Sequence, residues 1–172
     1  DSVKVWMKHP YVKKAIPLLE NVKLSKSQFM ACRHANGVDW WLLKQAHDTN
    51  MVYRFLVTKD SIYHFGNVGF AEPHFSKWDI GGQSMFNQLG TKYATVCLGL
   101  NKLFVADFDR CTAELSVPKV ISIANYPIKP PDNTMDTMPR GICFSPNGNF
   151  LYVVKTYNIF QYELNQPDSS LA

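Results

Sequence analysis

The sequence predicts an all-β fold built from one repeated unit of four short strands. Aromatic residues make up 13% of the 172 residues, which favours strands, and charged residues make up only 19%, too few for a coiled coil. Short apolar runs end at turn residues along the chain, and the only helical spacing, near residues 11–19, is flanked or interrupted by Pro10 and Pro17. A chain of this length is expected to form one domain that buries roughly 70% of its unfolded surface.

Three segments of the chain share the same order of features, each around a turn glycine. Gly37, Gly90 and Gly148 are spaced 53 and 58 residues apart. A short strand pattern precedes each glycine, a strongly apolar one follows it, and one or two further strand patterns come after. A tight hairpin needs a residue at positive φ, and Asn36-Gly37 and Asn147-Gly148 are dipeptides that hairpins favour. We name the successive strands of a unit a, b, c and d.

Strand b is apolar on both faces, in residues 40–43 of the first unit and 150–154 of the third. A strand packed between two sheets has this pattern, and Trp40 and Trp41 would then point to opposite faces. A four-stranded unit of about 55 residues that stacks face to face is typical of a β-propeller blade. The sequence therefore predicts a β-propeller fragment of about three four-stranded antiparallel blades. A β-sandwich or a β-solenoid is the alternative, because both also consist of short strands with turn signals.

All units are predicted to belong to one propeller domain. Residues 1–28 are expected to end a preceding blade, and residues 29–80 and 81–126 to form blades. Residues 127–139 form a Pro-rich inter-blade loop in this interpretation, and residues 140–172 an incomplete blade. Because propellers close with about four to eight blades, three units predict further blades in a longer parent chain.

Charge and apolar runs argue against two classes of partner. The net charge is +4, but the excess is scattered over residues 1–28 rather than gathered on a face with stacking aromatics, so no nucleic-acid partner is expected. The longest apolar run, residues 150–154, is far shorter than the roughly 20 residues that span a bilayer, so no membrane span is expected. The four cysteines match no zinc-binding spacing and permit disulfides without requiring them.

No catalytic, cofactor-binding or metal site is predicted. The five histidines form no metal-binding pattern, and neither a phosphate loop nor a nucleophile elbow is present. Two polar clusters are better explained as turn structure. We expect Arg33 and Asp39 to pair across the a–b turn while His34 bonds to backbone. In the c–d turn, Asp109 and Thr112 are expected to cap backbone N–H groups.

Two motifs resemble a known family. Residues 33–41 (Arg-His-Ala-Asn-Gly-Val-Asp-Trp-Trp) and 107–116 (Asp-Phe-Asp-Arg-Cys-Thr-Ala-Glu-Leu-Ser) are similar to signatures of propeller-like regions in large secreted or surface proteins of gliding bacteria with type IX secretion. Residues 145–154 resemble the broader WD40-like blade signature of lactonase-like and YVTN-type propellers. Ala113 stands where the family usually has Gly, and Val38 where it usually has Arg, so the match is to a divergent member. The resemblance implies an extracellular or cell-surface location.

The predicted function is that of a non-catalytic binding, display or scaffold module with a protein or glycan partner. The alternative is a lactonase-like hydrolase, suggested by the broader blade signature. In a propeller, b–c turns and d–a connectors emerge on one face, and a–b and c–d turns on the other. Variable loops carry binding residues more often than short turns do. We therefore expect binding at Asp48, His74 and Asp136 on the first face, whereas Arg33 and Arg110 mark the opposite face.

Overall fold

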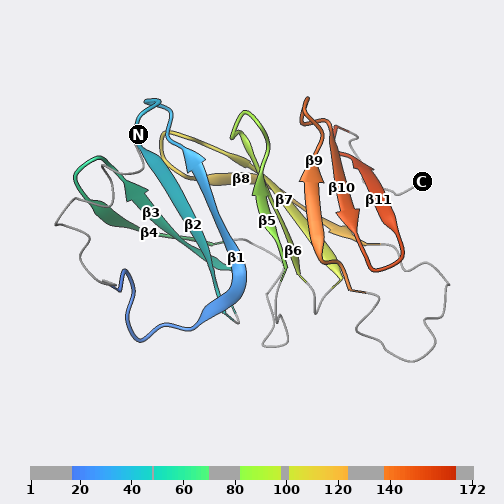
Figure 1. Ribbon diagram of the computed structural model, residues 1–172, viewed down its shortest axis with the longest axis horizontal. Coiled ribbons are helices and arrows are strands. Elements are labelled where there is room, and N and C mark those ends of the chain that lie inside the picture. Colours follow the sequence, from blue (N-terminus) through green and yellow to red (C-terminus); the bar gives the residue numbers. More distant parts are fainter. Residues whose placement is uncertain (1–16, 48, 70–81, 98–100, 124–137, 166–172) are drawn as a thin grey trace, which may run out of the picture.

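A computed structural model of the protein describes residues 17–47, 49–69, 82–97, 101–123 and 138–165. Within these residues the chain forms eleven strands in three antiparallel sheets (Figure 1). The described residues include no helix at all, and therefore none able to span a bilayer.

Each sheet follows the order of the chain, so that neighbouring strands are joined by hairpins. The first sheet contains four strands: β1 (Leu24–Arg33), β2 (Trp40–Ala46), β3 (Met51–Val57) and β4 (Ile62–Gly69). The second also contains four: β5 (Ser84–Phe86), β6 (Lys92–Cys97), β7 (Lys102–Phe108) and β8 (Leu115–Ser122). The third contains three described strands: β9 (Gly141–Phe144), β10 (Phe150–Val154) and β11 (Ile159–Glu163).

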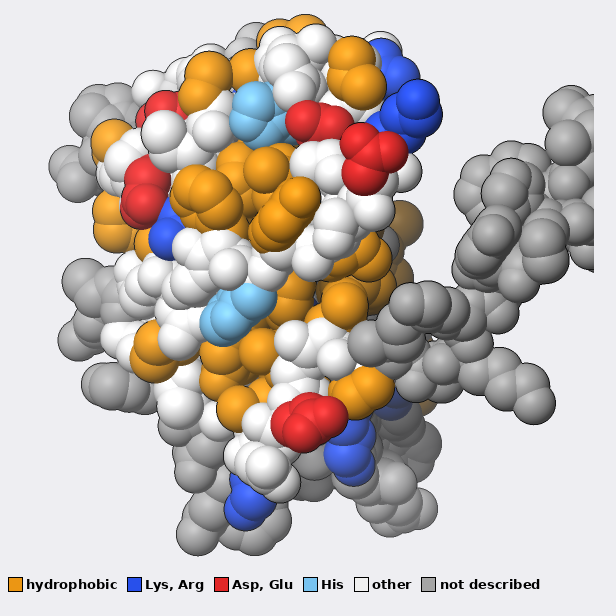
Figure 2. Space-filling model, turned by 90° about the vertical axis from the view of Figure 1, so that its left-hand side faces the viewer, with side chains coloured by type: hydrophobic (Ala, Val, Ile, Leu, Met, Phe, Trp, Pro, Cys, Tyr) orange, Lys and Arg blue, Asp and Glu red, His pale blue; other side chains and the backbone are white. Residues whose placement is uncertain are grey.

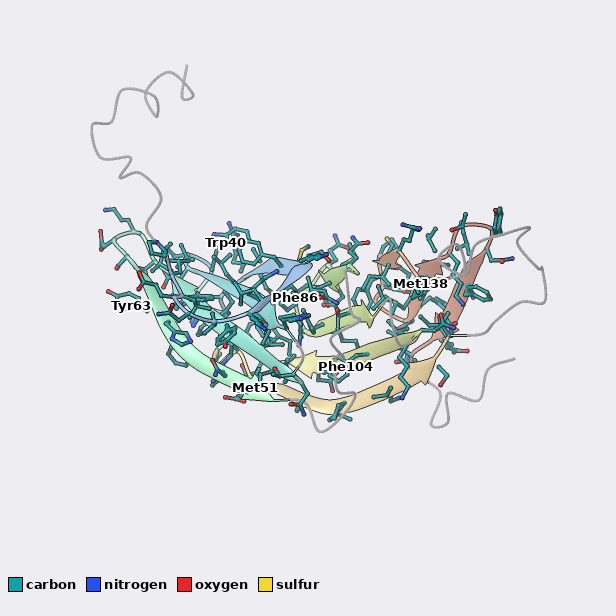
Figure 3. All side chains as sticks on the ribbon, turned by 90° about the horizontal axis from the view of Figure 1, so that it is seen from below. Trp40, Met51, Tyr63, Phe86, Phe104 and Met138 are labelled. Carbon is teal, nitrogen blue, oxygen red and sulfur yellow. The ribbon has the colours of Figure 1, made fainter. Side chains whose placement is uncertain are left out.

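The three sheets stack face to face along an arc. Seen from below, β1, β5 and β9 lie on the inner side of the arc, whereas β4 and β8 lie on its outer side (Figure 3). A sandwich would enclose one core between two sheets, and a solenoid would pair parallel strands. Meandering four-stranded sheets stacked around an inner row of first strands are β-propeller blades, which confirms the predicted fold class.

The same turn joins the first two strands of every sheet. In each case the glycine N–H donates to the carbonyl three residues before it, at 2.9–3.0 Å. The glycine φ lies between +69° and +73°, a conformation that side chains rarely adopt, at Gly37, Gly90 and Gly148. Because the turns are identical, the third residue after each glycine pairs with the fourth residue before it. The three sheets can therefore be compared position by position.

Two apolar cores fill the spaces between the sheets. The core between the first and second sheets consists mainly of Trp41, Leu43, Val52, Phe86, Tyr93, Phe104 and Phe108. The core between the second and third sheets consists mainly of Ala94, Val96, Leu103, Ile121, Leu151, Val153 and Tyr162. Strand β6 is buried on both faces, because Tyr93 points to the first sheet and Ala94 to the third.

The two adjacent tryptophans of β2 point to opposite faces, as the sequence predicts. Trp41 is 1% exposed and packs in the core between the first and second sheets. Trp40 is 42% exposed on the other face of the first sheet. The side chain that stabilises the stacking of sheets is therefore Trp41.

Strand β1 begins at Leu24, whereas the strand pattern in the sequence begins at Phe29. Residues 24–28 therefore belong to the first described sheet and do not end a preceding one, and the described residues 17–23 form no strand. The reason is that this half of β1 is irregular. Its register against β2 shifts, and Gln28 has a φ of +43°.

Polar contacts, not alternating apolar residues, hold the irregular half of β1 in place. The ammonium group of Lys44 on β2 donates to the carbonyl oxygen of Ser25 at 2.7 Å and to that of Ser27. The side-chain amide of Gln28 donates to the carbonyl of Val96 in the second sheet at 3.1 Å. Burial lowers the pKa of Lys44, because the charged form loses hydration there.

Replacing Trp41 with alanine is expected to cost about 3–5 kcal/mol of unfolding free energy, because it empties a core position and removes an indole N–H donor. The matched control is Trp40→Ala, which removes the same atoms from a half-exposed position and is expected to cost less than half as much. Urea unfolding followed by circular dichroism, at a concentration where sedimentation shows a monomer, measures both. Equal losses would contradict the assignment of Trp41 to the core.

Candidate binding pocket

The three residues predicted to bind a partner, Asp48, His74 and Asp136, lie outside the described residues. Their role stays a prediction. What the structure does describe is a pocket on the opposite face, where the a–b and c–d turns emerge. The two residues that mark this face in the sequence analysis, Arg33 and Arg110, both line the pocket.

The pocket lies between the end of β1 and the first turn of the second sheet, on the inner side of the arc. Its volume is about 410 Å³, within the range of small-ligand and peptide pockets. Trp40 and Arg33 form one wall, and Gln88 and Leu89 form the other. Figure 3 shows Trp40 beside the inner strands of the first sheet and Phe86, a further lining residue, where the first and second sheets meet.

The wall from the first sheet is a stacked pair of side chains. The guanidinium carbon of Arg33 lies 5.5 Å from the centre of the Trp40 ring, a cation–π contact. The sequence analysis predicted that Arg33 pairs with Asp39. This prediction is wrong, because Arg33 stacks on Trp40 instead. The carboxylate of Asp39 instead accepts a hydrogen bond from the side-chain amide of Asn36 at 2.7 Å, because the tight turn brings these two together.

The neighbouring His34 behaves as predicted. Its Nδ1 accepts a hydrogen bond from the backbone N–H of Asn36 at 3.0 Å, which places the ring in the turn. The ring also lies 5.4 Å from that of Trp41, so His34 covers the buried indole. These contacts give His34 a structural role in the turn.

The second guanidinium, that of Arg110, ties the two sheets together at the base of the pocket. It donates to the carbonyl oxygens of Arg33 at 2.9 Å, His34 at 3.2 Å and Leu89 at 3.3 Å. The carbonyl of Arg110 in turn accepts the indole N–H of Trp41 at 2.8 Å. Because its donors meet neutral carbonyls, the positive charge of Arg110 is oriented but not neutralised.

The pocket is consequently electropositive. None of its lining residues is acidic, and within the described chain neither Arg33 nor Arg110 forms an ion pair. The nearest carboxylate in sequence, Asp109, accepts the backbone N–H of Cys111 at 2.7 Å. This hydrogen bond lowers the pKa of Asp109, and it confirms the predicted cap of the c–d turn.

The floor of the pocket contains a thiol with little reactivity. Cys32 is buried, and burial raises the pKa of its thiol despite the nearby charge of Arg110. A raised pKa keeps the thiol neutral near pH 7, and a neutral thiol is a poor nucleophile. Cys32 therefore serves as a small apolar contact against Gly90.

An ion pair between the first and second sheets was not predicted from the sequence. Arg54 on β3 lies 2.6 Å from the carboxylate of Glu114, in the turn between β7 and β8, and also donates to the carbonyl of Thr112 at 3.2 Å. The signal in the sequence was a lone arginine inside the apolar strand 51–57, since a buried charge needs a partner. The strand pattern does not say which acidic residue supplies it.

No group of three or more His, Cys, Asp or Glu residues within the described ranges is close enough to hold a metal ion. The polar side chains that line the pocket are those of Arg33, Arg110, Asn87 and Gln88. Such groups bind and orient a partner through hydrogen bonds and charge.

No protein-family model matches the chain, and no curated protein matches its sequence. Solved structures do match its fold. A putative 6-phosphogluconolactonase from Bacteroides uniformis has a TM-score of 0.54 and 17% identity, over 83% of this chain and 38% of that one. The periplasmic gluconolactonase of Pseudomonas aeruginosa has a TM-score of 0.52 and 16% identity, over 83% and 36%. The β-propeller domain of Myceliophteria thermophila Cps50 (Swd1) has a TM-score of 0.51 and 14% identity, over 79% and 40%.

These comparisons agree with the strand order in placing the chain among β-propellers. The chain spans less than half the length of each of the three structures. At such low identity the likeness concerns the fold alone, and propellers with very different activities share that fold.

A pair of glycine variants tests the close packing at the pocket floor. Gly37 and Gly90 occupy the same turn position at nearly the same φ, but an added Cβ meets nothing within 4 Å at Gly37 and lies 2.5 Å from the Cys32 sulfur at Gly90. Gly37→Ala is expected to cost about 1–2 kcal/mol for the left-handed backbone alone. Gly90→Ala should cost roughly 1–3 kcal/mol more, from overpacking. Equal losses of unfolding free energy for the two variants, measured by urea unfolding, would show that the pocket floor around Gly90 is not closely packed.

Proposed function

We propose that the chain is a non-catalytic binding module of a β-propeller, and that its partner is a protein segment carrying acidic and apolar side chains. The observation that supports this most is the pocket between β1 and the 87–91 turn. It combines an exposed aromatic wall with two guanidinium groups that have no carboxylate partner among the described residues.

Charge supports the acidic part of the proposal. The guanidinium of Arg33 is exposed at the pocket wall, and that of Arg110 is half-buried at its base. Arginine binds carboxylates through paired hydrogen bonds, and its charge-assisted bonds are stronger than neutral ones. An Asp or Glu side chain entering the pocket would supply the negative charge that the lining residues lack.

Apolar exposure supports the other part. Trp40 is 42% exposed and Leu89 67% exposed, on opposite walls of the same pocket. Tryptophan and arginine are the residues most enriched among those that dominate binding energy at protein interfaces. A partner that places one apolar side chain between these walls would cover both.

The location of the parent protein is a separate proposal. The similarity of residues 33–41 and 107–116 to propeller-like regions of gliding bacteria supports a place in a secreted or cell-surface protein. In that setting the module would display its pocket to proteins outside the cell.

Synthetic peptides test the pocket directly. We expect fluorescein-labelled heptapeptides with Asp or Glu on both sides of a Leu or Phe to bind the 172-residue chain in fluorescence anisotropy, and peptides with Lys in place of the acids not to bind. Leu89→Asp should weaken binding at least tenfold, because it removes an apolar wall and adds a negative charge. The matched control is Val117→Asp, because Val117 on β8 is 64% exposed and Leu89 is 67% exposed. The Val117→Asp variant should bind the peptides as well as the unaltered chain does.

Two results would contradict the assignment of the pocket. One is equal peptide binding by the Leu89→Asp and Val117→Asp variants. The other is loss of binding in the triple variant of Asp48, His74 and Asp136 to alanine while Leu89→Asp binds normally, which would place the site on the face of the b–c turns. An array of neutral and acidic glycans, run with the same variants, would reveal a glycan partner instead.

A lactonase activity is the second candidate, supported by the fold likeness to the two gluconolactonases and by the blade signature of residues 145–154. A pH-stat assay with glucono-δ-lactone and its 6-phosphate tests this candidate, with and without added divalent metal. If the chain is a binding module, both lactones should hydrolyse no faster with the protein than without it. A hydrolysis rate that increases in proportion to the protein concentration would favour the lactonase over the binding module.

A further inference from the structure

Leu89 is an exposed apolar side chain in a turn of the second sheet. Most exposed large apolar side chains of the described chain lie on strands, and Figure 2 shows such side chains gathered on the side of the first sheet. Leu89 instead lies between β5 and β6 and is 67% exposed. The second sheet packs between the first and the third, so this turn has a neighbouring sheet on each side. The exposure of Leu89 is therefore a property of the turn and does not depend on where the stack of sheets ends.

The other two sheets have asparagine at this position, directly before the turn glycine. The side-chain oxygen of Asn36 accepts hydrogen bonds from the backbone N–H groups of Val38 and Asp39, both at 3.0 Å. That of Asn147 accepts one from the backbone N–H of Asn149 at 3.1 Å. The asparagine therefore stabilises the turn by capping N–H groups of the residues that follow the glycine.

In the second sheet a different residue has this role. The side-chain oxygen of Asn87, two residues before Leu89, accepts the backbone N–H groups of Thr91 at 2.8 Å and Lys92 at 3.0 Å. These are the first and second residues after the glycine, as Val38 and Asp39 are in the first sheet. The leucine side chain therefore contributes no hydrogen bond to the turn, and an asparagine in its place would find both N–H groups already paired.

The backbone around Leu89 is held on both sides. Arg110 donates to the carbonyl of Leu89 at 3.3 Å beside the first seam, by which we mean the contact between the first and second sheets. The N–H of Gly90 donates to the carbonyl of Asn87 at 2.9 Å, and a Cβ added at Gly148 in the third sheet would lie only 3.2 Å from the side-chain nitrogen of Asn87. A side chain on a fixed backbone loses less conformational entropy when a partner covers it.

We propose that Leu89 selects the apolar side chain of the partner, so that the pocket prefers a segment with a large apolar residue such as Leu or Phe between its acidic residues. This inference rests on the proposed binding function of the pocket. Arg33 and Arg110 attract the acidic residues, but charge does not distinguish a leucine from an alanine between them. Trp40 on the opposite wall already carries the guanidinium of Arg33 and is less exposed than Leu89. Leu89 is therefore the larger apolar surface for the partner to cover, and the turn does not need it for its own structure.

A pair of labelled heptapeptides tests this selection by fluorescence anisotropy with the 172-residue chain. One peptide has Leu at its centre and the other has Ala, with the same acidic residues on both sides. The unaltered chain should bind the Leu peptide about tenfold or more tightly than the Ala peptide, because the larger side chain buries more apolar surface. In the Leu89→Asn variant the ratio of the two dissociation constants should fall to about two or less. Leu89→Met keeps an apolar side chain of similar size and should keep most of the ratio.

Urea unfolding separates partner selection from a structural role of Leu89. Leu89→Asn should leave the unfolding midpoint unchanged, because Asn87 already caps the turn. The matched control is Asn147→Leu, the reverse exchange at the equivalent position of the third sheet. It should lower the midpoint, because it removes the acceptor of the Asn149 N–H. It should bind both peptides as the unaltered chain does, because Asn147 does not line the pocket.

Three results would overturn the inference while the proposed function stands. The Leu89→Asn variant could keep the full preference for the Leu peptide, or the unaltered chain could bind both peptides equally. The third result is a midpoint for Leu89→Asn as low as that for Asn147→Leu, which would show that Leu89 serves the turn. Failure of the proposed function gives a different result, since neither peptide would then bind the unaltered chain, and the inference would fall with it.

Discussion

The stacking of apolar sheet faces is the interaction on which the structure depends, because a single small sheet cannot bury enough apolar surface to be stable. At the first seam, Trp41 is the largest buried side chain, and its indole N–H donates to the carbonyl of Arg110. The guanidinium of Arg110 returns the contact by donating to the carbonyls of Arg33 and His34. Apolar burial supplies most of the free energy, and these directed hydrogen bonds fix where the sheets meet.

Because the a–b turn is the same in every sheet, equivalent strand positions meet where the first sheet packs on the second and where the second packs on the third. A slip of one residue in strand register would move every apolar side chain to the other face of its sheet. The left-handed glycine fixes the register in each sheet. Tyr93 and Leu151 therefore face the sheet that precedes their own, whereas Leu43 and Val96 face the sheet that follows their own. The second sheet is buried on both sides because it takes part in this contact twice.

The fold could be predicted from the sequence because glycine spacing and doubly apolar b strands are local signals. What could not be predicted are contacts between sheets. Arg54 and Glu114 are 60 residues apart, and neither the strand pattern around Arg54 nor the turn that holds Glu114 identifies the partner. The first half of β1 was missed because Lys44, from the next strand, holds polar residues there. The pocket joins a strand end to turns of another sheet, so an argument from variable loops alone does not find it.

One exchange at a repeat position sets the character of the face of the first sheet that carries Trp40. Arg33 occupies the position that Phe86 and Phe144 hold in the other sheets, where the phenyl rings are buried. A flat guanidinium stacked on Trp40 keeps an apolar contact surface like that of a ring, while its charge stays hydrated at the edge. A phenylalanine there would leave two bare aromatic rings side by side. The arginine therefore keeps the edge of this position polar, and it gives the pocket beside it a positive charge.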